Sequence, residues 1–243
     1  MQTDVLLDRF LTALAPLDPV GVWAHGSLAG GDYQEGRSDL DLIAVLPWLT
    51  PRTVWRLAKL HARLRAEPLA GQLHCTYLTP SADPGRRHLT WAHQELFKRP
   101  VTPVTRRELH DFGRVLHGKP PTGLLPPVSD RELADFVVRD QRDFWRPALD
   151  NAPLWTRDVW VDLGLVTFAR ASVTLREGRL ISKREALELL PGLGAPVEVV
   201  EDIRGRRYGD PATPSARPAV ANRAELTRNY LGPAIDGLVA AYG

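Results

Sequence analysis

The sequence is poor in sulfur: cysteine and methionine each occur once in 243 residues. Cys75 has no second cysteine to pair with, so an intramolecular disulfide is excluded and a reducing compartment fits. No apolar run approaches the roughly 18 residues that span a bilayer. The N-terminal segment lacks the basic residues and the long apolar core of a signal peptide. We therefore expect a cytoplasmic protein without a membrane partner.

Neither basic nor acidic residues are in large excess. The 31 Lys and Arg residues against 29 Asp and Glu residues give a formal net charge of +2. This balance supplies no overall field that would attract nucleic acid, and we expect no such partner. None of the histidines has metal-ligand spacing with Cys75, which argues against a zinc site. The composition is that of an ordinary globular protein, and we expect a monomer.

The most informative stretch begins at Gly26-Ser27, directly after a short apolar run. A glycine-rich connection leads to Asp39 and Asp41, which flank a leucine at the start of a second apolar run. Alternate residues of a strand point to one face, so the two carboxylates project together, with Cα atoms roughly 6.6 Å apart. Such a pair can hold Mg²⁺, which often completes its shell with substrate phosphates. The glycine lets backbone N–H groups approach a phosphate, and the serine hydroxyl adds a hydrogen bond.

These features together are what phosphoryl or nucleotidyl transfer requires. An Asp-x-Asp pair by itself is more often the solvent face of a half-buried strand. The Gly-Ser element upstream, at the end of another apolar run, favours the functional interpretation here.

The order Gly-Ser, spacer, Ser-Asp-Leu-Asp-Leu over residues 26–42 resembles the signature of the polymerase β-like nucleotidyltransferase superfamily. It is most similar to the aminoglycoside adenylyltransferases of the streptomycin/spectinomycin type, and residues 162–183 resemble their helix-turn-Ser-Lys segment. No Gly-Lys-Ser/Thr follows, so the motif is not a P-loop. The resemblance implies ATP and Mg²⁺ as cofactors and an aminoglycoside as the acceptor of AMP.

The resemblance also implies roles for single residues. Asp39 and Asp41 are the expected catalytic residues and metal ligands, and Gly26 and Ser27 are expected on the triphosphate. Lys183 is expected on the phosphates and Tyr208 near the nucleotide. A lysine in the first turn of a helix opposes the helix dipole, so Lys183 gains little from a purely structural role. Tyr208 is equally compatible with packing in a loop.

His74 stands where the adenylyltransferases have a glutamate that acts as base towards the substrate hydroxyl. Imidazole accepts a proton near neutral pH, so His74 is a candidate base. Alternatively, Glu95 or Asp83 enters the site, or catalysis is weakened and nucleotide binding remains. A strand histidine that faces solvent is the ordinary alternative.

Acidic residues and tryptophans are interleaved in the second half. Asp158 and Asp162 lie four residues apart, on one face of a predicted helix, and Trp155 precedes them. An aminoglycoside is a polycation whose rings stack on aromatic side chains, so we expect these three residues to bind the acceptor. A solvated helix face with core tryptophans explains each residue singly. The acceptor could also be a protein or another metabolite, as in toxin–antitoxin relatives.

The expected fold class is an α/β (α+β) N-terminal nucleotidyltransferase domain with a mixed sheet, over residues 1–120, and an all-α substrate-binding domain over 128–243. The proline-rich run between them marks the junction. Periodicity and end signals predict the following elements. Strands are expected at 20–24, 40–46 and 73–78; helices at 51–66, 86–98 and 221–241; a loop at 204–216.

Overall fold

The computed structural model describes residues 1–209 and 219–243. The chain divides into two compact units, Met1–Val128 and Ser129–Gly243, and each is described by itself. No helix among the described residues is both long and apolar enough to cross a membrane.

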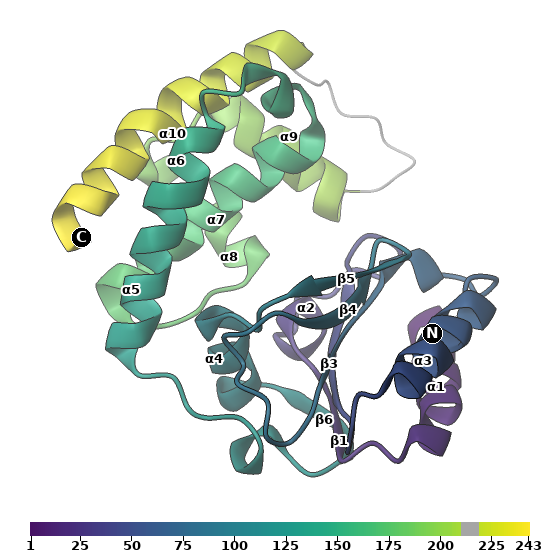
Figure 1. Ribbon diagram of the computed structural model, residues 1–243. Helices are drawn as coiled ribbons and strands as arrows, with labels where there is room; N and C mark the ends of the chain where they lie inside the picture. The colour runs from purple at the N-terminus through teal and green to yellow at the C-terminus, as the bar shows by residue number, and fades with distance from the viewer. Residues whose placement is uncertain (210–218) are drawn as a thin grey trace. The chain divides into compact units, whose positions relative to one another are not determined.

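A six-stranded mixed sheet forms the first unit, with strand order β5-β4-β3-β2-β1-β6 (Figure 1). The strands are β1 (Gly21–Ala24), β2 (Leu40–Val45), β3 (Leu73–Leu78), β4 (His88–Ala92), β5 (Glu95–Arg99) and β6 (Arg114–Gly118). β2 and β3 are parallel, and all other neighbouring strands are antiparallel. The mixed sheet with its helices, followed by a helical second unit, confirms the predicted fold class.

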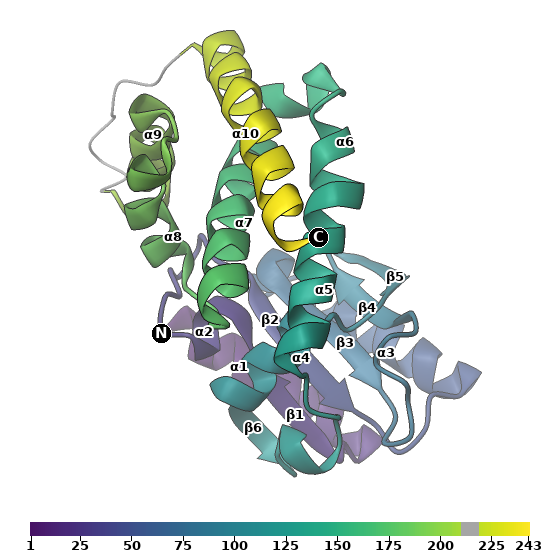
Figure 2. The same ribbon diagram turned by 90° about the vertical axis from the view of Figure 1, so that its left-hand side faces the viewer.

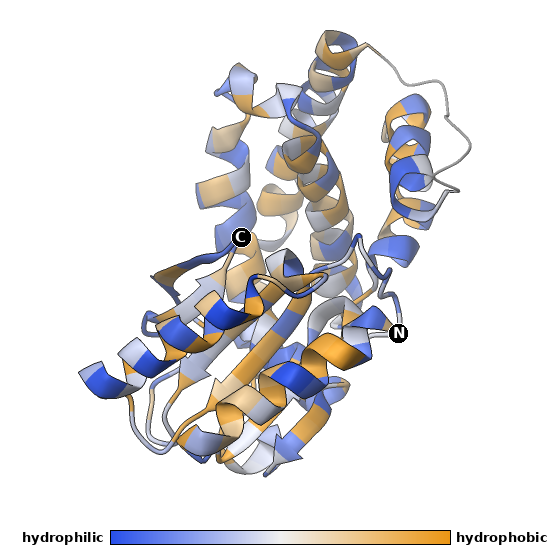
Figure 3. Cartoon of the chain, turned by 90° about the vertical axis from the view of Figure 1, so that its right-hand side faces the viewer, coloured by the Kyte–Doolittle hydropathy of each residue, from blue (hydrophilic) through white to orange (hydrophobic). Residues whose placement is uncertain are grey.

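Helices α1 (Gln2–Leu14) and α3 (Pro51–Leu64) cover one face of the sheet through a shared apolar cluster. Figure 3 shows these two helices in alternating orange and blue, as amphipathic helices on a core require. α3 begins as predicted, because the Thr50 hydroxyl accepts a hydrogen bond from the Thr53 N–H. The other helices of the unit are α2 (Gly26–Ala29) and α4 (Pro103–Asp111).

The helix predicted over residues 86–98 is wrong. The segment forms the antiparallel hairpin β4-β5, joined by His93 and Gln94, which have positive φ angles of 52° and 62°. Two consecutive positive φ values are typical of the two-residue turns that match the twist of a hairpin. Pairing with the edge of the sheet decides the structure of this segment.

The second unit is helical. Its helices are α5 (Asp130–Asp140), α6 (Arg146–Ala148), α7 (Asp158–Glu177), α8 (Lys183–Leu189), α9 (Val197–Tyr208) and α10 (Val220–Tyr242). A π-helical turn, Gln141–Trp145, joins α5 to α6. α10 packs against α7, and the two lie side by side in Figure 2. Ser182 and Glu185 form a capping box at the start of α8.

The loop predicted over residues 204–216 is wrong at its start. Residues 204–208 are the last part of α9 instead of a loop. Residues 210–218 lie outside the described residues. The final helix, α10, covers the predicted range.

A buried histidine lies in the core between α3 and the sheet. The His61 ring stacks on Trp91, with ring centroids 4.3 Å apart, and its Nε2 lies 2.6 Å from the Tyr77 hydroxyl. Burial lowers the pKa of His61 to about 3. The folded protein therefore keeps this ring neutral at pH values where the unfolded chain protonates it.

This difference in the pKa of His61 predicts that the folded protein loses stability in acid. Because the folded pKa lies below the unfolded one, the stability is fully present above about pH 6.5 and is lost as the pH falls towards 3. Between pH 7 and pH 4.5 the linkage amounts to about 2–3 kcal/mol. His61→Gln should reduce the loss of unfolding free energy over this interval by that amount, measured by urea denaturation at both pH values. The exposed His117→Gln serves as control, and equal pH dependence in the two variants would contradict the prediction.

Candidate functional site

Three side chains lie in a row across neighbouring strands. Asp41 of β2 is the register partner of His74 of β3. The His25 N–H, just beyond β1, donates to the Asp41 carbonyl over 3.0 Å. Leu40 and Leu42 point into the cluster under α1 and α3, so Asp41 and its partners project from the opposite face. The row therefore stands on the side of the sheet that α1 and α3 leave uncovered.

His74 lies against both predicted metal ligands. Its Nδ1 is 3.6 Å from Asp41 Oδ1, and its Nε2 is 3.8 Å from Asp39 Oδ1. The side chain of His74 is 5% exposed, whereas those of Asp39 and Asp41 are 51% and 26% exposed. Within the described part of the chain, His74 Nε2 has no hydrogen-bond partner. A buried polar atom without a partner, between two carboxylates, indicates a place for a polar ligand.

The surroundings of Asp41 favour its ionised form. Burial by itself would raise its pKa, but the interaction with His74 and the nearby charges of His25 and Arg99 lower the pKa to about 2. The carboxylate is thus ionised throughout the neutral range, as a cation ligand must be.

The Gly-Ser turn lies directly beside this carboxylate. Gly26 has a φ of +61°, and a Cβ atom built there would lie 2.9 Å from Asp41 Oδ2. Only glycine combines this conformation with this close approach. The half-buried Ser27 follows at once, so its position is set by the same turn.

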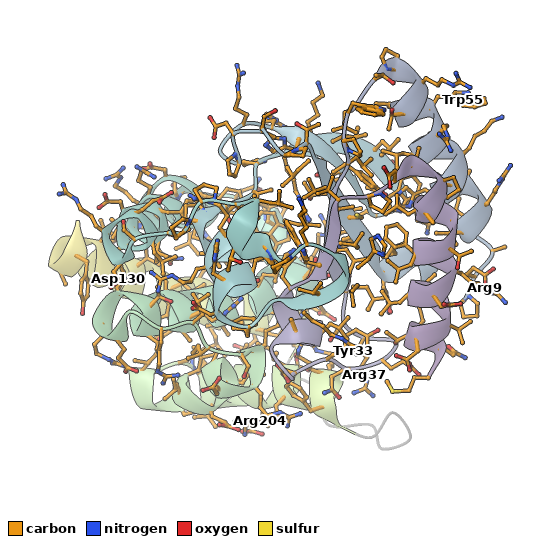
Figure 4. All side chains as sticks on the ribbon, turned by 90° about the horizontal axis from the view of Figure 1, so that it is seen from below. Arg9, Tyr33, Arg37, Trp55, Asp130 and Arg204 are labelled. Atoms are coloured by element: carbon orange, nitrogen blue, oxygen red, sulfur yellow. The ribbon has the colours of Figure 1, made fainter. Side chains whose placement is uncertain are left out.

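The connection between the turn and the Asp-x-Asp segment is tied to α1. The Tyr33 hydroxyl, labelled in Figure 4, lies 2.9 Å from Thr3 Oγ1. Glu35 Oε2 accepts from the Thr3 N–H over 3.0 Å and from its hydroxyl over 2.8 Å. These bonds restrain the segment that leads into Asp39.

Of the candidate bases, His74 is the one that lies against both aspartates. Asp83 is in an exposed turn, where its Oδ1 accepts from the Gly85 N–H over 2.9 Å. Glu95 is exposed at the start of β5 and pairs with Ala92 across the hairpin. The His93 ring meets the His74 ring edge-on, with centroids 4.7 Å apart.

Sequence analysis did not identify Glu108 of α4 as part of this site. Its Oε2 lies 3.1 Å from His25 Nδ1 and 3.2 Å from the Gly26 nitrogen. No motif in the sequence connects Glu108 with residues 26–41. His93 was not identified for another reason, because its hairpin was predicted as a helix.

Two predicted nucleotide residues belong to the second unit, at helix ends that lie next to each other. Lys183 is the first residue of α8, and Tyr208 is the last residue of α9. The guanidinium carbon of Arg184 lies 4.0 Å from the centroid of the Tyr208 ring. α8 and α9 thus bring Lys183 and Tyr208 into one neighbourhood of this unit.

The predicted acceptor residues are engaged inside the second unit. Arg206 donates to both Asp162 oxygens, over 2.6 and 2.7 Å. The buried Arg223 pairs with Asp158. Trp155 is fully buried, and its indole N–H donates to the Ala148 carbonyl over 2.9 Å. The two aspartates therefore share a network of ion pairs, and the tryptophan belongs to the core.

Comparison with known proteins gives a matching family model for the first unit and a shared fold for the chain. Residues 7–115 match a family model described as the nucleotidyltransferase domain. No curated protein sequence matches the chain significantly. The match confirms the resemblance to the polymerase β-like nucleotidyltransferases and supports a transferase.

One solved structure extends the likeness over the chain. It is the crystal structure of spectinomycin adenyltransferase AAD(9) from Enterococcus faecialis with ATP and spectinomycin. The TM-score is 0.68 at 15% identity, covering 97% of this chain and 98% of that chain. At this identity the likeness shows the fold, which is the one the resemblance to adenylyltransferases predicted.

The turn geometry yields a prediction with a built-in control. Gly26→Ala should lower the unfolding free energy by about 1–2 kcal/mol for the positive φ, plus a further cost for the contact with Asp41. Gly31→Ala has a similar φ of +76° but no atom within 4 Å of its Cβ, so it isolates the backbone cost. Urea denaturation of both variants measures the difference. Equal losses would show that the approach of Asp41 to the turn is unimportant for stability.

Proposed function

We propose that this protein transfers AMP from ATP to a hydroxyl group of a small molecule, and that an aminoglycoside is the first acceptor to test. One observation carries the proposal: Asp39 and Asp41 flank the buried His74 ring beside the Gly26-Ser27 turn, and Nε2 of this ring has no hydrogen-bond partner among the described residues. The nucleotidyltransferase family match supports the reaction class. The fold shared with a spectinomycin adenyltransferase supports the acceptor class by analogy.

The proposed reaction is an in-line displacement. The acceptor oxygen forms a bond to the α-phosphorus of ATP, the bond from that phosphorus to the bridging oxygen breaks, and pyrophosphate leaves. The hydroxyl proton passes to His74, because a neutral imidazole can accept a proton. Positioning of the two reactants accounts for much of the acceleration.

Asp39 and Asp41 fit a magnesium ion that substrate phosphates help to hold. The described residues contain no group of three or more His, Cys, Asp or Glu that could hold a metal ion by itself. Mg²⁺ is commonly bound through one or two carboxylates together with substrate phosphates, so two are sufficient. When bound, the ion would neutralise charge on the triphosphate.

The remaining contacts are proposed from the resemblance. Ser27 would bind the triphosphate, and Lys183 and Tyr208 would bind the nucleotide. Asp158 and Asp162 are 44% and 30% exposed, and they would meet a cationic acceptor as members of the ion-pair network with Arg206 and Arg223. Trp155 would support them from the core rather than stack on the acceptor.

Removal of the two carboxylate charges tests the proposal directly. The double variant Asp39→Asn, Asp41→Asn should lose at least about 100-fold in turnover, since neither amide replaces an anionic ligand of Mg²⁺. Its circular dichroism spectrum should stay unchanged. Pyrophosphate release is measured with ATP, Mg²⁺ and spectinomycin or streptomycin, and Asp83→Asn in the exposed turn is the control. Undiminished release by the double variant would defeat the assignment of the site.

His74 gives a second, independent prediction. His74→Ala should slow adenylyl transfer about 10²–10⁴-fold, the usual contribution of a general base, while ATP still binds. His74→Glu should retain activity, because a carboxylate at this position lies in the same contacts. Radiolabelled ATP followed into the acceptor measures the rate. A rate in His74→Ala equal to that of the wild type would remove His74 from the mechanism.

A second candidate function is nucleotide binding without catalysis, favoured by the histidine in place of the family's glutamate. The same labelling experiment separates the candidates. Label in an aminoglycoside supports the first, and label in a polypeptide indicates a protein acceptor. Thermal stabilisation by ATP without pyrophosphate release from any acceptor indicates binding alone.

A further inference from the structure

Glu108 reaches the Gly-Ser turn from an element 82 residues away in the sequence. Its Oε2 accepts hydrogen bonds from the Gly26 N–H, at 3.2 Å, and from His25 Nδ1, at 3.1 Å. The side chains of His25 and Glu108 are only 9% and 7% exposed. Because an ionised carboxylate only accepts, the proton of this bond resides on Nδ1 of His25.

A buried carboxylate at this place is costly unless it is well paired. The next residue of α4, Leu109, contributes to an apolar cluster, so packing alone would be served by an apolar side chain. Glu108 instead binds two donors of a single turn. Burying this carboxylate costs free energy, which indicates that the conformation of this turn has a role besides stability.

The restrained turn connects two parts of the site. The His25 N–H is bonded to the Asp41 carbonyl over 3.0 Å, and the Cβ position of Gly26 lies 2.9 Å from Asp41 Oδ2. Ser27 projects from the same backbone. A shift of this turn would therefore move Ser27 and press on Asp41 together.

We propose that Glu108 is a positioning residue for nucleotide binding: it fixes the His25-Gly26 turn from which Ser27 meets the triphosphate, and it touches no substrate itself. The inference rests on the proposed function of the site. It also revises the role expected of Gly26. The N–H of Gly26 is bound to Glu108, so Gly26 contributes a conformation to the turn instead of a hydrogen bond to phosphate.

The test compares E108A and E108Q with the wild type. Calorimetric titration with ATP and Mg²⁺ gives the Kd of ATP, and steady-state rates give the KM of the acceptor. E108A should raise the Kd of ATP about tenfold. E108Q should raise it about threefold, because an amide oxygen still accepts both bonds but without the strength of a charged acceptor. The KM of the acceptor should stay unchanged in both variants.

Glu67 provides the matched control. It is a partly buried glutamate of the same unit, ion-paired with Arg9 on α1, on the side of the sheet away from the turn. E67A should lower the melting temperature while leaving the Kd of ATP within twofold of the wild type. A Kd that rises as much in E67A as in E108A would reduce Glu108 to a structural role and overturn the inference.

The remaining outcomes are also decisive. Wild-type protein that binds no ATP overturns the proposed function, and this inference with it. Wild-type binding together with an unchanged Kd in both Glu108 variants overturns the inference alone. If E108A does not fold, the Kd of E108Q decides, and a value equal to that of the wild type overturns the inference.

Discussion

The site depends on the register of β2 against its two neighbours. Asp41 lies opposite His74 in the parallel pair and next to His25 beyond β1. A slip of one residue would turn Asp41 towards the face that α1 and α3 cover. Such a slip would also expose Leu40 and Leu42, which are fully buried, at a cost of about 1.5–3 kcal/mol each. The apolar core therefore holds the polar row in place.

The first three strands could be predicted because each is a short, largely apolar run with a glycine or a proline two residues beyond its end. The hairpin β4-β5 could not, because its turn is His93-Gln94 and lacks the Asn-Gly or Asp-Gly signal by which hairpins are recognised. Pairing with β3 supplies the information that the local sequence lacks, since β4 is hydrogen-bonded to Cys75 and Thr76.

The same limit applies to the site. Spacing alone places Asp39 and Asp41 together, but it cannot bring Glu108 to Gly26, because that contact depends on where α4 packs. In the second unit, helical spacing correctly places Asp158 and Asp162 on one helix. Their arginine partners lie 65 and 44 residues further along the chain. The acidic residues that the sequence places on one helix are thus members of an ion-paired network in the fold.

Compared with a glutamate at position 74, the histidine changes the charge of the site more than it changes the arrangement of the side chains. Two carboxylates beside an imidazole carry one negative charge fewer than three carboxylates would, and a third one in contact would raise the pKa values of its neighbours. Asp41 instead has a pKa of about 2, because His74, His25 and Arg99 outweigh the effect of burial. Its charge is therefore available without help from a bound cation. Under the proposed function, the two carboxylates would hold the cation and the imidazole of His74 would be the base.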